Sequence, residues 1–95
     1  MAEKQAVSVI WRDVPIEITF TRHVFGQNFD HVELRAPQPL PVTQTGYRSH
    51  FMPHDPDLDL DRLKTWVIAW LDEKSQDKSW RDWVQRSKQG DLFEL

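Results

Sequence analysis

A chain of 95 residues is expected to form a single domain, residues 1–95, with a modest core. The absence of cysteine excludes disulfide frameworks, Cys-type zinc sites and thiol nucleophiles, and a net charge of −3 argues against a simple phosphate-backbone binder. No apolar run is long enough to span a membrane, and residues 1–9 lack the apolar core of a signal peptide. We therefore expect a cytoplasmic protein with no membrane partner.

The first half of the chain alternates apolar and polar side chains with the period of a β-strand. We predict strands at about residues 6–11, 16–22, 31–36 and 47–51. In the last of these, one face carries Tyr47, Ser49 and Phe51 and the other carries Arg48 and His50. We expect Arg48 and His50 to lie on the solvated face of the sheet. For Tyr47 and Phe51 two interpretations stay open: they complete the core, or their segment forms part of a binding surface.

The second half shows helical periodicity. We predict a helix over about residues 57–74, capped by Asp57 or Asp59, and a shorter helix over about 79–88 that ends at Gly90. The apolar stripe of the first helix is made of Leu60, Leu63, Trp66, Val67, Trp70 and Leu71. Strands followed by helices indicate an α+β fold, in which a small antiparallel sheet of three to four strands is packed on one face by two C-terminal helices.

Candidate catalytic and metal sites in this chain do not withstand inspection. His50 and His54 have the His-x-x-x-His spacing of a zinc site and Asp55 lies beside them, but Pro53 interrupts a helix there and the general-base Glu of the zinc-protease motif is missing. We therefore expect no catalytic residue, no metal and no cofactor. The protein is predicted not to be an enzyme, and a His-based metal-dependent hydrolase is the least favoured alternative.

The most distinctive segment is LPVTQTGYRSHF, residues 40–51. It combines a proline-rich approach, hydroxyl groups, a glycine bend and then an aromatic residue, an arginine and a histidine. This segment resembles a motif of small uncharacterised bacterial proteins, several of them carried by plasmids and other mobile elements. The resemblance is closest over residues 40–51 and looser over 11–51. It implies a bacterial origin and an accessory role, with no assigned activity and no catalytic residues.

Our leading hypothesis is a small non-enzymatic accessory protein that binds another macromolecule, with a protein as the favoured partner, and acts as an inhibitor or regulator carried by a mobile element. Arginine and tyrosine are common anchors of protein interfaces. A threonine and a histidine lie beside these anchors in the sequence. The candidate binding residues are Arg35, Thr45, Tyr47, Arg48 and His50. A homodimer is compatible with the same features.

Two other binding functions remain open. A nucleic-acid-binding or transcription-related module would use Arg35, Tyr47 and Arg48 together with Arg81 and Arg86 of the second helix. An acidic mimic of nucleic acid would instead use the carboxylates along the two helices to occupy a nucleic-acid channel of its partner. Basic residues interspersed along both helices weaken the negative field that such a mimic requires.

Overall fold

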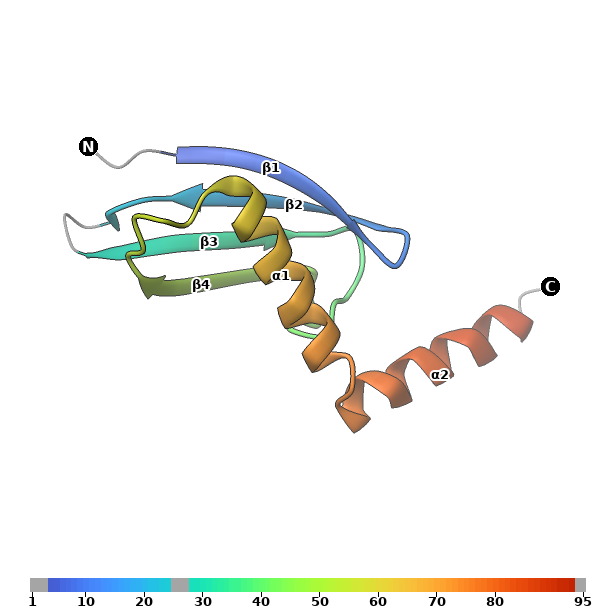
Figure 1. Ribbon diagram of the computed structural model, residues 1–95. Helices are drawn as coiled ribbons and strands as arrows, with labels where there is room; N and C mark the ends of the chain where they lie inside the picture. Colours follow the sequence, from blue (N-terminus) through green and yellow to red (C-terminus); the bar gives the residue numbers. More distant parts are fainter. Residues whose placement is uncertain (1–3, 25–27, 94–95) are drawn as a thin grey trace.

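The computed structural model describes residues 4–24 and 28–93 and shows a four-stranded antiparallel sheet followed by two helices (Figure 1). The strands are β1 (Lys4–Trp11), β2 (Val14–Thr21), β3 (Phe29–Arg35) and β4 (Tyr47–Pro53), and they lie in the order β1-β2-β3-β4. The helices are α1 (Leu60–Lys74) and α2 (Lys78–Phe93). The predicted α+β fold class is confirmed.

The first two strands form a tight hairpin. Only Arg12 and Asp13 lie between them, with φ angles of 47° and 68°, and Trp11 pairs directly with Val14. A two-residue turn with positive φ at both positions has a twist that matches that of the flanking strands. Because the turn is so short, β2 begins two residues earlier than the alternation of the sequence indicates.

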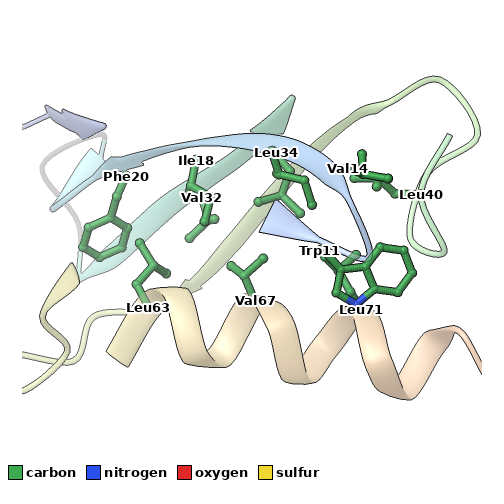
Figure 2. Packing of buried hydrophobic residues seen from close by; sticks show 11 residues of the cluster. Trp11, Val14, Ile18, Phe20, Val32, Leu34, Leu40, Leu63, Val67 and Leu71 are labelled. Carbon is green, nitrogen blue, oxygen red and sulfur yellow. The ribbon is translucent and has the colours of Figure 1, made fainter. Parts of the chain in front are cut away.

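The core lies between one face of the sheet and α1 (Figure 2). Leu63, Val67 and Leu71 of α1 are fully buried against the central strands β2 and β3. The buried apolar side chains of these two strands are Val14, Ile16, Ile18, Phe20, Val32 and Leu34. Burying an aliphatic side chain of this size contributes about 2 kcal/mol. The helix begins after Asp59, whose carboxylate accepts a hydrogen bond from the Arg62 N–H at 2.8 Å, which confirms a predicted cap.

The second helix shares a pocket with the loop of residues 39–44 along its first half, as far as Arg86, and runs away from the sheet (Figure 1). The indole of Trp80 lies 5.9 Å from that of Trp11, and Trp83 stacks on Trp80 at 5.0 Å. The prediction that Gly90 ends this helix is wrong, since α2 continues to Phe93. A glycine inside a helix costs about 1 kcal/mol, which is not enough by itself to end it. In the described part of the chain, neither helix combines the length and the apolar character that crossing a membrane requires.

Gly46 fixes the entry into β4. Its φ is +82°, and a Cβ added there would lie 2.5 Å from the carbonyl oxygen of Ala36. The Ala36 N–H donates to the Gly46 carbonyl oxygen at 2.8 Å, which continues the pairing of β3 and β4 into the loop. Glycine is therefore required both for the left-handed backbone and for the close approach of the two chains.

We predict that Gly46→Ala lowers the free energy of unfolding by about 1–3 kcal/mol, because it adds both backbone strain and a clash with Ala36. Urea unfolding monitored by tryptophan fluorescence measures the change. Gln44→Ala is the matched control, since Gln44 is exposed in the same loop and should shift the free energy by less than about 0.5 kcal/mol. Equal stability of wild type and Gly46→Ala would contradict the proposed role of this glycine.

Candidate functional site

The face of the sheet that α1 leaves uncovered carries the most exposed apolar side chains of the described residues. Ile10 is 73% exposed, Phe29 and Phe51 are each 48% exposed, and Tyr47 is 43% exposed. Each of them alternates along its strand with residues of the helix-covered face, as Phe29 does with the buried Asp30. All four therefore lie on one side of the sheet, which we call the open face.

A carboxylate organises the polar part of the open face. The Tyr47 hydroxyl donates to Glu33 Oε2 at 2.8 Å, the Arg35 guanidinium donates to the same oxygen at 3.1 Å, and His31 Nδ1 lies 3.8 Å from Oε1. The hydrogen bond from Tyr47 is the main cause that lowers the pKa of Glu33; it outweighs burial, and His31 and Arg35 add to it. The same hydrogen bond raises the pKa of Tyr47.

The aromatic rings of the open face are held by further contacts. The imidazole of His31 stacks on Phe51 with centroids 4.3 Å apart and an interplanar angle of 9°, and its Nε2 lies 2.5 Å from Ser49 Oγ. The Arg35 guanidinium lies 5.1 Å from the centroid of the Tyr47 ring. The open face thus presents aromatic and charged groups in a fixed arrangement.

Two threonine hydroxyls position the backbone of Tyr47. Thr43 Oγ1 donates to the Tyr47 carbonyl oxygen at 2.7 Å, and the Tyr47 N–H donates to Thr45 Oγ1 at 3.3 Å. The two hydroxyls also lie 3.1 Å from each other. Thr45 therefore supports Tyr47 at the edge of the sheet, on the outer side of β4.

The structure brings together Arg35, Thr45 and Tyr47 of the predicted binding residues, but it places Arg48 and His50 on the opposite face. The expected assignment of the two faces of β4 is wrong, because the register pairs Arg48 with Leu34 and His50 with Val32, both of which point into the core. The predicted site is therefore divided between the two sides of the sheet.

Arg48 and His50 cover the tryptophans of α1. The ring of His50 lies 5.5 Å from Trp66 and 5.1 Å from Trp70, and the Arg48 guanidinium lies 5.8 Å from the centroid of Trp70. Burial, with a smaller contribution from the charge of Arg48, lowers the pKa of His50. These two residues shield indole surface at the margin of the core.

Three residues that take part in the contacts of the open face were not among the predicted binding residues: His31, Glu33 and Phe51. The alternation of residues 31–36 does place His31 and Glu33 on the open side, but charged residues are ordinary on a solvated strand face and gave no signal. For Phe51 the sequence left open a place in the core or in the binding segment, and its register partner His31 shows that it lies on the open face.

A second cluster surrounds a buried carboxylate at the start of β3. Asp30 is 0% exposed and accepts hydrogen bonds at 3.0 Å from the His23 N–H and from His54 Nδ1. The rings of His23 and His54 lie 4.0 Å apart. Burial alone would raise the pKa of Asp30, but these hydrogen bonds and the nearby charges outweigh it and hold the pKa below its ordinary value of 3.8.

The three weak metal candidates, His50, His54 and Asp55, have separate surroundings. His50 packs on the tryptophans and His54 pairs with Asp30, while Asp55 Oδ1 accepts a hydrogen bond from the Asp57 N–H at 2.9 Å. Within residues 4–24 and 28–93, no group of three or more histidine or acidic side chains is arranged to hold a metal ion. The spacing in the sequence therefore does not correspond to a ligand set in the described structure.

A family model described as the KlcB third domain matches residues 4–80. The match covers all four strands, α1 and the first residues of α2, and so it includes both the open face and the Asp30 cluster. No curated protein and no solved structure matches the chain.

We predict that Asp30→Asn destabilises the protein by about 1.5–3 kcal/mol at neutral pH, because it removes a charged acceptor from a buried site. The pKa of Asp30 is lowered by folding, so its contribution is complete above the unfolded pKa and is lost as the pH falls through the folded pKa. The stability difference between wild type and Asp30→Asn should therefore shrink below about pH 4. Urea unfolding at several pH values measures it.

Glu17→Gln is the control for this experiment, since Glu17 is exposed on the open face. This substitution should leave the free energy of unfolding nearly unchanged, both at neutral pH and as the pH is lowered. A difference between wild type and Asp30→Asn that stays constant into the acid range would show that the charge of Asp30 does not stabilise the fold.

We predict that Tyr47→Phe raises the pKa of Glu33 toward its ordinary value of 4.5, because it removes the strongest hydrogen bond to the carboxylate. A pH titration of the Glu33 carboxyl carbon by NMR measures this shift. Thr45→Ser, which keeps a hydroxyl near the Tyr47 backbone, should leave the midpoint where it is. An unchanged midpoint in Tyr47→Phe would mean that the hydrogen bond does not form in solution.

Proposed function

This chain belongs to the KlcB third-domain family, and on that premise we propose that it is a small accessory module that binds another protein through the open face of its sheet. A third domain is one folded unit of a larger protein, and a docking role suits such a unit. The family also suggests an accessory role of the plasmid type, in which the module inhibits or regulates the protein that it binds.

One observation carries this proposal: on the neighbouring strands β3 and β4 the open face bears Phe29, Tyr47 and Phe51, three of the four most exposed large apolar side chains of the described residues. Scattered exposed apolar residues are normal on a soluble protein, but several on one surface rimmed by polar groups mark interaction sites. Tyrosine and arginine, here Tyr47 and Arg35, are among the residues that contribute most to binding energy at interfaces.

The contacts around Glu33 favour binding, because they reduce the side-chain conformational entropy that is lost when a partner binds. Side chains that must be immobilised at an interface each cost about 0.5–1.5 kcal/mol. The side chains of Arg35 and Tyr47 are already held by Glu33, and His31 is already stacked on Phe51. A partner would meet a preorganised surface, so more of the contact energy would appear as affinity.

The charges of the open face favour a protein over a nucleic acid. Lys4 and Arg35 are balanced by Glu17 and Glu33 on the neighbouring strands. Binding to a phosphate backbone depends on an excess of cationic side chains that displace counterions. A balanced surface with exposed aromatic rings instead resembles the composition of protein–protein interfaces.

We predict that the double variant Tyr47→Ala/Phe51→Ala reduces affinity for the cellular partner at least about tenfold, since each substitution removes an exposed aromatic anchor. Partners captured from a bacterial lysate by wild type are identified, and their dissociation constants are then measured with purified proteins. Thermal unfolding followed by circular dichroism confirms that the variant is folded.

Arg48→Ala is the matched control, because Arg48 lies on the same strand but on the helix-covered face. It should bind the partner as wild type does. Binding that survives the double variant, or that is lost only in Arg48→Ala, would contradict the assignment of the open face as the binding surface.

A further inference from the structure

The strand β1 lies at an edge of the sheet and pairs only with β2. The two residues that flank a two-residue hairpin turn, here Trp11 and Val14, form a hydrogen-bonded pair. The backbone groups of alternate residues of an edge strand point away from its neighbour, so those of Lys4, Ala6, Ser8 and Ile10 point outward. In the described part of the chain, no group forms a hydrogen bond with them.

A groove of about 530 Å³ runs between this edge and α1. Val9, Ile68 and Ala69 supply apolar side chains to it, while Ser8 and Ile10 border it at the edge of the strand. Lys64 and Asp72 lie at successive turns of α1 on either side of Ile68. The groove lies beside a row of outward-pointing N–H and C=O groups. These two features together match a β-strand that adds to the sheet edge and places alternate side chains in the groove.

We propose that this strand is β1 of a second copy of the chain, which pairs antiparallel with the first about a two-fold axis near Val9, the middle of the three strand residues that line the groove. Such pairing sets Ser8 opposite Ile10 of the second copy and Val7 opposite its Trp11, so no like charges face each other. Val7 and Val9 of each copy, which are only partly buried within one chain, then enter the groove of the other. The result is a continuous sheet across two copies.

The charges beside the groove agree with a two-fold arrangement. An isologous interface brings one end of a surface against the opposite end of the same surface in the partner. The Lys64 end of one copy therefore approaches the Asp72 end of the other, which are opposite in charge. Each of these charges also has a partner within its own chain: Asp61 lies 3.6 Å from Lys64, and Arg12 lies 3.8 Å from Asp72. We therefore assign Lys64 and Asp72 a role in orienting the two copies and only a small contribution to the affinity of the dimer.

The other edge of the sheet is less suited to pairing. Two hydrogen bonds at the ends of the β3–β4 pair show which backbone groups of β4 point inward: the Ala36 N–H donates to the Gly46 carbonyl oxygen, and the His54 N–H donates to the Asn28 carbonyl oxygen. Tyr47 therefore points its backbone outward, where the hydroxyls of Thr43 and Thr45 already occupy both its N–H and its C=O. Local side chains thus block part of this edge, a common way to prevent strand addition.

Sedimentation equilibrium of the purified chain over a wide concentration range tests the proposal. We expect a concentration-dependent shift from the 11.3 kDa chain mass toward twice that mass. Ser8→Pro should weaken the dimer at least about tenfold, because it removes an outward N–H while leaving the β1–β2 hydrogen bonds intact. Ser49→Pro is the matched control on the other edge and should leave the dimer unchanged.

Ile68→Glu provides a second variant that does not alter the strand. It places a charge in the groove on α1, and it should also weaken the dimer if Ser8→Pro proves too unstable to measure. Wild type that keeps the mass of one chain at every concentration would overturn the proposal, as would a dimer that survives both Ser8→Pro and Ile68→Glu. Because the groove lies on the helix side of the sheet, either result leaves the function of the open face to be judged by its own experiment.

Discussion

The contact of Leu63, Val67 and Leu71 with the central strands is the constraint on which the rest of the structure depends. Side chains of a strand alternate between its two faces, so covering one face of β2 and β3 with a helix determines the environment of every residue in the sheet. A shift of one residue in any register would move apolar side chains into water and polar ones into the core. The open face exists because α1 covers only the other side.

The same constraint explains the unusual position of Arg48 and His50. The core-facing side of β4 lies at the margin of the area that α1 covers, where Trp66 and Trp70 extend toward the edge of the sheet. A residue there needs to contact indole surface and still reach water. Arg48 does this with its aliphatic stem and a guanidinium that lies over the Trp70 ring. His50 does so by packing its imidazole against both indoles, and its lowered pKa favours the neutral ring.

The sequence was sufficient for the parts of the fold where periodicity is strong. In α1 the apolar residues recur at helical spacing, and in β2 and β3 they occupy every second position. The buried face of each of these elements was therefore predicted correctly. In β4, both faces are mixed: one has Tyr47, Ser49 and Phe51, and the other has Arg48, His50 and Met52. Hydrophobicity alone favours placing the two aromatic residues inside. Only the register with β3, fixed by the pairing at Gly46, shows the reverse.

The two proposed surfaces are thermodynamically related although they lie on different parts of the sheet. Pairing of β1 across two copies would place their open faces side by side in one continuous sheet, since strand addition leaves both helices on the same side. A partner with two matching sites would then bind the second open face at a high effective concentration. Such binding would also favour the dimer, because a ligand that contacts both copies stabilises the assembled state. Self-association at the edge and recognition on the open face would therefore strengthen each other.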